Sequence, residues 1–351
     1  MKSQIISLIL LTPLFLFSQV SLIGSIVADD DSPIPYASIA IEGTSRGTIA
    51  NAVGKFELKA TIGSTLIISC LGFQTKRVVV DHSFLKIVLT ELPIQLQEVL
   101  VYSELTARDV IAKAIAMIPI NYDFEPFTYR FYGLRENFYS QKPGFIHEAV
   151  FDIYSKGWKY ELLKLRGKYK EGFKPQFDKS RTIWLGFIDY QFFEKNPEAW
   201  ALKRSSLSLF TYEFVDYVLL DGRPTNIIKA TPNEKGLQKK KKEQTYYVDV
   251  ETHAIAKVVR VGGWDVEISY RKEGDKWYLH SYFTVANKVY KRENESFKNT
   301  FLVTEVIRGE NSTIKPLGYQ VVEEAKFRMS DWNSSFWEDY NYMVLDEIWK
   351  N

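Results

Sequence analysis

The segment IEGTSRGTIANAVGKFEL, residues 41–58, contains GTSRG, which matches the nucleophile pattern G-x-S-x-G with Ser45 at its centre. In hydrolases with this pattern, the serine sits on a sharp turn between a strand and a helix. The residues after Ser45 have no helical pattern, because glycine and asparagine precede KFEL, which alternates like a short strand. We therefore interpret Gly43 and Gly47 as turn residues and assign no catalytic role to Ser45.

The histidines are the candidate ligands for a catalytic metal. The sequence contains four: His82, His147, His253 and His280. A catalytic zinc needs three protein ligands and an open position, and none of the four belongs to an H-E-x-x-H pair. His147 is followed by Glu148, but neighbours on a strand point to opposite faces, so the two cannot chelate one ion together. The sequence predicts no metal, no cofactor and no catalytic residue.

The carboxylates leave one enzymatic alternative open. Glu323 and Glu324 form one of several adjacent pairs, but a glycosidase needs two carboxyl groups at a set separation across a cleft. The sequence has no G-x-x-x-x-G-K-[ST] loop and no dinucleotide fingerprint after a strand. A hydrolase whose site is assembled from residues far apart in the chain remains the alternative to a non-enzymatic protein.

The composition is that of a packed protein without a strong electrostatic field. The 351 residues carry a net charge of +2, and 15% of them are aromatic. A nearly neutral chain does not attract nucleic acid, so we expect no nucleic-acid partner. The single cysteine, Cys70, follows an apolar strand pattern and is expected to be a buried thiol, so the cores must supply the stability. The lysine run at residues 239–242 is expected to be a solvated hairpin loop, with contact to an anionic membrane as the alternative.

Residues 1–18 match the pattern of a secretory signal peptide. Lys2 precedes an apolar run over residues 5–17, which Pro13 interrupts. The run is shorter than the roughly 20 apolar residues of a membrane-spanning helix, and no later stretch qualifies. We expect cleavage before Gln19 and export to the periplasm, the outer membrane or the cell surface, with no transmembrane segment in the mature chain.

Residues 19–102 are expected to form a small β-sandwich. Short strand-like segments are separated by clusters of Gly, Pro, Asp and Ser, and no helical period interrupts them. The expected strands are residues 22–27, 36–41, 56–58, 65–70, 76–80 and 85–89.

Several positions in this region follow the order and spacing of one known family. They are Gly24, Pro35, Gly43-Thr44, Gly47-Thr48, Gly54-x-Phe56-x-Leu58 and Leu66-x-x-Ser69-x-x-Gly72-Phe73. The region thereby resembles the carboxypeptidase D regulatory-like domain; Asn51 replaces the usual aspartate, but both residues suit a turn. The resemblance implies a transthyretin-like sandwich, common in exported proteins of Bacteroidetes-type bacteria, that is an accessory module without peptidase chemistry of its own.

Residues 103–351 are expected to form a second domain that begins with a helix. Thr106 is a helix cap, and Asp109 is placed to answer it. One apolar stripe follows, formed by Val110, Ile111, Ala114, Ile115 and Ile118. Pro119 is expected to stop this helix, which should pack on a sheet.

Beyond the helix the pattern is one of long alternating strands, typical of an antiparallel sheet. The expected strands are residues 127–139, 145–156, 160–168, 214–220, 226–230, 246–250, 255–259, 264–271, 277–285 and 300–308. The chain is therefore predicted to be mainly β, with the sandwich followed by an α+β domain in which a helix packs on a large curved sheet, a half-barrel. The hairpin YYVDVETHAIAKVV and the strand GDKWYL resemble the LolA/LolB-like lipoprotein carriers, in which a concave apolar face holds acyl chains.

Five aromatic residues are the candidate lining of a ligand cavity: Trp184, Phe187, Tyr190, Phe192 and Phe193. They interrupt the strand pattern, in the kind of segment where loops carry function, and such a segment could close the open end of a half-barrel. The alternative is that these side chains only fill the core.

These observations together predict a non-enzymatic protein of the cell envelope. We expect it to bind a lipid or another hydrophobic ligand, or to dock on a partner protein. The alternatives are the dispersed-site hydrolase and a carbohydrate-binding accessory protein. A fragment of a TonB-dependent receptor is disfavoured, because too few lipid-facing strands follow the regulatory-like module.

Overall fold

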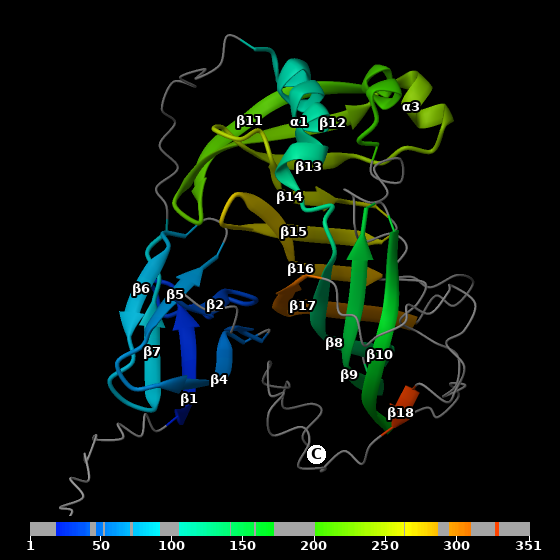
Figure 1. Cartoon of the computed structure of the whole chain (residues 1–351). Helices are drawn as coiled ribbons and strands as arrows, with labels where there is room; N and C mark the ends of the chain where they lie inside the picture. Colours follow the sequence, from blue (N-terminus) through cyan, green and yellow to red (C-terminus); the bar gives the residue numbers. More distant parts are fainter. Residues whose placement is uncertain are drawn as a thin grey trace, which may run out of the picture.

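The computed structural model describes residues 19–42, 47–51, 53–70, 73–91, 105–140, 142–157, 159–171, 201–262, 264–286, 295–309 and 327–329. The expected signal peptide, Ser45 and the boundary between residues 102 and 103 lie outside these ranges. Within them, the chain forms a small sandwich, a large sheet and a helix that packs on that sheet (Figure 1).

The N-terminal strands form a sandwich of two sheets. One sheet has the strand order β4-β1-β7 and the other β3-β2-β5-β6. The strands are β1 (Gln19–Val27), β2 (Ser38–Ile41), β3 (Gly47–Ile49), β4 (Lys55–Thr61), β5 (Thr65–Ser69), β6 (Lys76–Val79) and β7 (Phe84–Val88). Burial alternates along β4 and β5, and the buried side chains, with Phe56 at the centre, form one apolar core. Cys70 is partly buried against this core.

The six predicted strands correspond to β1, β2 and β4 to β7, but the sequence missed β3. This strand, Gly47–Ile49, directly follows the GTSRG segment, so a strand and not a helix follows Ser45. A Cβ atom on Gly47 would lie 2.5 Å from the carbonyl oxygen of Ile39, so the glycine permits the close approach of β3 to β2. Three residues are too short to show a period, which is why the strand was missed.

The second part of the chain is dominated by one sheet with the strand order β11-β12-β13-β14-β15-β16-β17-β8-β9-β10-β18. The strands before the gap at residues 172–200 are β8 (Phe127–Tyr139), β9 (Lys142–Lys156) and β10 (Lys159–Glu171). The strands after it are β11 (Phe210–Leu220), β12 (Arg223–Pro232), β13 (Gln244–Asp249), β14 (Ile255–Arg260), β15 (Asp265–Glu273), β16 (Lys276–Ala286), β17 (Glu295–Arg308) and β18 (Phe327–Met329). Neighbouring strands in this sheet pair in antiparallel fashion, except that β10 and β18 pair in parallel. In Figure 1 the sheet curves around the helix α1.

The helix α1 (Ala107–Asn121) begins as predicted and ends later than predicted. Thr106 and Asp109 form a capping box, in which the backbone N–H of Asp109 donates to Oγ1 of Thr106 at 3.2 Å. Pro119 does not stop the helix, which runs two residues further, because the N–H of Tyr122 still donates to the carbonyl of Ile118 at 3.2 Å. A proline in the last turn removes one backbone donor but leaves this closing bond intact.

Two shorter helices flank the pair of strands β11 and β12 in the chain. A 3₁₀-helix, η1 (Arg204–Leu209), leads into β11, and α3 (Glu234–Gln238) precedes the lysine run between β12 and β13. The first lysines of that run are exposed, in agreement with a solvated loop, although the sequence had not indicated α3.

The two faces of the large sheet are covered by different parts of the chain. Phe131 of β8 belongs to the core that the helix α1 shares with the concave face. Its neighbour Tyr132 points to the other face, where it clusters with Ile49 of the sandwich and Leu302 of β17. The predicted fold class is thus confirmed, and the sandwich packs against the back of the sheet. No helix in the described part of the chain is long and apolar enough to span a membrane.

Candidate functional site: a cleft between the sandwich and the large sheet

A cleft of about 920 Å³ lies between the sandwich and the large sheet. Its walls come from the β3-β2-β5-β6 sheet, from the turn joining β11 and β12, from the turn joining β15 and β16, and from β17. A smaller cavity of about 240 Å³ lies further along the same interface, and Ile49, Leu219, Tyr270, Arg271 and His280 line both. The cleft therefore sits where two independently packed cores meet.

The walls of the cleft combine apolar side chains with one buried donor. Ile41 and Ile49 face it from the sandwich, and Leu302 faces it from β17. Trp277 at the start of β16 is only 4% exposed, and no hydrogen-bond partner for its indole N–H is found in the described part of the chain. A buried N–H of this kind favours a ligand or a water molecule that can accept a hydrogen bond.

A polar contact between the two modules involves Arg271 and His280, which line both cavities, and Ser38, which lines the smaller one. Oγ of Ser38, on β2, lies 2.9 Å from Nε2 of His280, on β16. Nη2 of Arg271, on β15, donates to Oγ of Ser38 at 3.2 Å and lies 3.4 Å from Nε2 of His280. Nε of Arg271 is 3.8 Å from Oδ2 of Asp221, in the turn between β11 and β12. Side chains from three segments distant in sequence thus meet at this point.

The environment of His280 determines what the Ser38–His280 pair can do chemically. Burial, and next the charge of Arg271, hold the pKa of His280 well below its usual value. The imidazole is therefore neutral, and its Nε2 is in hydrogen-bond contact with Oγ of Ser38 and lies beside the guanidinium of Arg271. A nucleophilic serine needs a neighbour that takes up its proton, and an imidazolium beside Arg271 is strongly disfavoured. The pair has the distance of a nucleophile and a base, but not the basicity.

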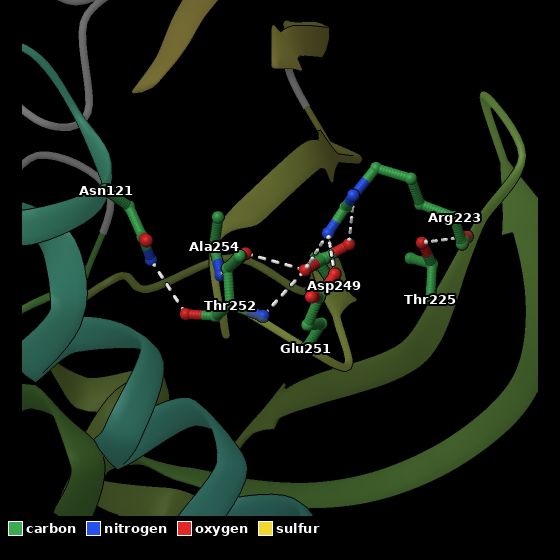
Figure 2. Close-up of polar contacts among 7 residues, drawn as sticks. All are labelled: Asn121, Arg223, Thr225, Asp249, Glu251, Thr252 and Ala254. Carbon is green, nitrogen blue, oxygen red and sulfur yellow. Dashed lines mark hydrogen bonds and ion pairs between the residues drawn. The ribbon is translucent and has the colours of Figure 1, made fainter. Parts of the chain in front are cut away.

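One ion-pair network fixes the β11–β12 turn that closes the cleft (Figure 2). Arg223 donates to Asp249 through Nε at 2.7 Å and through Nη2 at 3.0 Å, and Nη2 also donates to Glu251 at 2.7 Å. Asp249 accepts in addition from the N–H and the hydroxyl of Thr252, at 2.7 and 2.6 Å. Burial alone would raise the pKa of Asp249, but the hydrogen bonds from Arg223 and Thr252 outweigh it and hold the pKa below its usual value.

The same network connects the turn to the end of α1. Nδ2 of Asn121 donates to the carbonyl of Thr252 at 3.0 Å (Figure 2). The hydroxyl of Tyr122 donates to the carbonyl of Ile255 at 2.8 Å and accepts from its N–H at 2.9 Å. Tyr122 also forms an isolated β-bridge with Trp277. The buried tryptophan of the cleft is thus held by the helix that fills the concave face.

A second polar group is buried on the concave face, beyond the part that α1 covers. Nδ2 of Asn137 donates to Oε1 of Glu295 at 3.0 Å, and the guanidinium of Arg135 lies over the ring of Phe297 at 4.3 Å. Burial lowers the pKa of Arg135 to about 9, and burial together with Arg135 lowers the pKa of His147 to about 3.

The surroundings of His147 and Glu148 confirm that these neighbours on β9 point to opposite faces. His147 lies beside Arg135 on the concave face, whereas Glu148 interacts with Tyr132 on the other. In the described residues, no group of three or more His, Cys, Asp or Glu side chains is arranged to hold a metal ion.

The predicted cavity residues, Trp184, Phe187, Tyr190, Phe192 and Phe193, lie outside the described residues, so their role stays a prediction. The cleft was not predicted. One signal could have drawn attention to it: His280 follows the apolar and aromatic run Trp277-Tyr278-Leu279 within a single strand. A polar residue at such a position indicates a polar partner on the covered side of the strand, but the sequence does not identify the segment that supplies this partner.

Comparisons with known proteins give one family match and several similarities to solved structures. Residues 22–101 match the family described as CarboxypepD_reg-like domain. Among solved structures, an outer membrane lipoprotein-sorting protein domain from Vibrio parahaemolyticus has 9% identity and a TM-score of 0.29, covering 59% of this chain and 93% of its own. A DUF1329 family protein from Desulfovibrio piger has 10% identity and a TM-score of 0.27, covering 60% and 98%. A LolA superfamily protein from Nitrosomonas europaea has 8% identity and a TM-score of 0.24, covering 60% and 96%.

The two comparisons differ in what they establish. The similarity to the solved structures is too low to indicate what this chain binds, and the search of curated proteins found no match. The family match covers only the sandwich and its continuation, so it does not describe the large sheet. Residues 22–101 of this chain thus match the carboxypeptidase regulatory-like domain, as the sequence predicted.

Proposed function

We propose that this chain is a non-enzymatic binding protein that holds a hydrophobic ligand in the cleft between the sandwich and the large sheet. The observation that carries the proposal is the cleft of about 920 Å³, walled by Ile41, Ile49, Leu219 and Leu302. Ligand sites are typically concave, mostly apolar and placed between domains, with a few polar groups that fix orientation. Trp277 and Arg271 supply such groups here.

The alternative of a hydrolase has one supporting distance, between Ser38 and His280. Because Arg271 and burial keep His280 from accepting a proton, this pair supports a structural contact between the modules better than it supports acyl transfer. The regulatory-like domain at residues 22–101 is consistent with an accessory role.

We also propose where the protein resides in the cell and how its chain divides into two modules. The signal-peptide pattern of residues 1–18 supports export to the periplasm, the outer membrane or the cell surface. We take residues 19–102 and 103–351 as the two modules, and both contribute walls to the cleft. A partner protein of the envelope, docking through the sandwich, is the second candidate occupant that the sequence suggested.

The proposal is tested by native mass spectrometry of the chain from Gln19 onward, purified from its host's envelope, with solvent extraction of any added mass. A discrete extractable hydrophobe is expected. A neutral fluorescent probe, N-phenyl-1-naphthylamine, then locates the site, and the test variant is Leu219→Trp. Leu219 is 51% exposed and lines the cleft, so a larger side chain should fill the space without disturbing a core.

Val215→Trp is the matched control, because Val215 lies on the same strand, is 52% exposed and does not line the cleft. Leu219→Trp should weaken probe binding severalfold, and Val215→Trp should leave it unchanged. A clean apo mass together with equal probe binding by both variants would contradict the proposal.

A further inference from the structure

We propose that the ligand of the cleft is an amphiphile with a single carboxylate, and that Arg271 binds this carboxylate at the junction of the two cavities. This inference rests on the proposed function, which it extends by naming the polar group of the ligand and the side chain that recognises it. Three features of the cleft support it: the charge partners of its arginines, the neighbours of Arg271 and the apolar walls around that residue.

Arg271 differs from the other arginines of the cleft in its charge partners. Arg77 donates to Glu42 at 3.0 Å, and Arg223 makes a forked pair with Asp249 at 2.7 and 3.0 Å. Arg271 has Asp221 at 3.8 Å, outside hydrogen-bond range, and no other carboxylate partner in the described part of the chain. Its side chain is 26% exposed, so water solvates the charge only in part. A guanidinium that is partly buried and has no carboxylate within hydrogen-bond range favours a ligand carboxylate that approaches both of its terminal nitrogens.

The two neighbours of Arg271 do not neutralise its charge. His280 is uncharged, because burial and Arg271 itself lower its pKa, and Ser38 contributes a neutral hydroxyl. The Ser38 hydroxyl can rotate, so it can donate to an incoming carboxylate as readily as to His280. The site thus offers the acid group of a ligand a fixed positive charge and one additional donor.

The charges around Arg271 favour a single negative charge on the ligand. The lining of the larger cavity carries four basic side chains, Arg77, Arg223, Arg271 and Lys272, and four acidic ones, Glu42, Asp221, Glu273 and Glu305. Arg77 and Arg223 already hydrogen-bond to Glu42 and Asp249, so a second negative charge on the ligand would meet no second arginine without a close carboxylate and would approach Asp221 and Glu273. A monocarboxylate therefore fits the site better than a dianionic phosphate.

The apolar part of the ligand has space directly beside the carboxylate. Arg271 lines both the 920 Å³ and the 240 Å³ cavities. Ile49 and Leu219 also line both, and Leu302 and Val303 extend the apolar wall of the larger one. An alkyl chain anchored at Arg271 can therefore run along this wall with its carboxylate at the junction.

The test compares decanoate with decanol, which has the same chain and no charge, by titration calorimetry on the chain from Gln19 onward at pH 8. The wild-type protein should bind decanoate at least about tenfold more tightly than decanol. Arg271→Gln should remove this preference and leave decanol binding unchanged, while Arg271→Lys should keep part of it. Arg108→Gln is the matched control, since Arg108 is an exposed arginine on α1 that lines neither cavity, and its effect should stay below about twofold.

The outcomes separate this inference from the proposed function. Equal binding of decanoate and decanol by the wild-type protein overturns the role of Arg271 and leaves hydrophobic binding in the cleft intact, and this comparison needs no variant to fold. Equal losses of decanoate binding in Arg271→Gln and Arg108→Gln overturn the role of Arg271 as a specific anchor. If neither compound binds and the Leu219→Trp variant takes up the neutral probe as well as wild type, both proposals fail.

Discussion

The buried carboxylate of Asp249 should contribute more to stability than any other single charge near the cleft, and Asp249→Asn tests this. Asp249 is 0% exposed and receives two hydrogen bonds from Arg223 and two from Thr252. Asparagine has the same shape. Its carbonyl oxygen can still accept from Thr252, but its NH₂ group then faces the N–H donors of Arg223, where both sides can only donate.

The magnitude follows from what remains after the substitution. Breaking a buried ion pair by removing one charge typically costs about 3–5 kcal/mol. Arg223 is only partly buried and keeps its 2.7 Å hydrogen bond to the exposed Glu251, so part of that cost is recovered. We expect Asp249→Asn to lower the free energy of unfolding by about 2–3 kcal/mol, at or just below the lower end of that range.

Urea unfolding followed by near-ultraviolet circular dichroism measures this change, with the double variant Arg223→Gln/Asp249→Asn completing a mutant cycle. The cycle should give a coupling energy of about 2 kcal/mol between the two residues. Glu251→Gln is the control, because an exposed partner contributes at most about 0.5–1 kcal/mol. If Asp249→Asn costs no more than Glu251→Gln, or if the coupling is near zero, the network does not hold the β11–β12 turn as described.

Two further predictions concern buried groups, one at the end of α1 and one on the large sheet. Tyr122→Phe removes the hydroxyl that bonds both backbone groups of Ile255, and it should lower the free energy of unfolding by about 1–3 kcal/mol, measured by urea unfolding; an unchanged midpoint contradicts the contact. His147 has a pKa of about 3 in the folded chain, below its unfolded value of about 6.5, so its contribution to stability is complete above about pH 6.5 and is lost as the pH falls toward 3. Between pH 7 and pH 5 the wild-type protein should therefore lose about 2 kcal/mol more than His147→Gln does, and equal losses in the two proteins refute the assignment.

Local signals were sufficient to predict most elements of the fold. The alternation of β15 and β16 and the caps of α1 are properties of short segments, and the structure contains them at the expected places. The prediction was less accurate where buried polar residues break the pattern. The sequence placed the start of β17 at Thr300, but the strand begins at Glu295. The prediction started too late because Glu295 and Asn299 are polar side chains at buried positions, and they conceal the alternation of apolar and polar residues.

The cleft could not be predicted, because its parts are far apart along the chain. Ser38 and Arg271 are separated by 233 positions, and they meet only because the sandwich packs on the back of the sheet. Period and turn chemistry identify which face of a strand is covered, but they do not identify the segment that covers it. The predicted aromatic cavity relied on residue types and on an interruption of the strand pattern, and its five residues lie outside the described part of the chain.

The pairing of β8 with β17 has a consequence for how the chain acquires its structure. Arg130 and Glu305, which pair across these strands, are 175 positions apart, so the loop that must close before they meet is nearly half of the chain. Until that closure, the long strands β8 and β17 each leave an edge of unpaired backbone groups that can join another chain. Folding should therefore be slow and sensitive to concentration, and a holding chaperone that protects these edges would raise the yield.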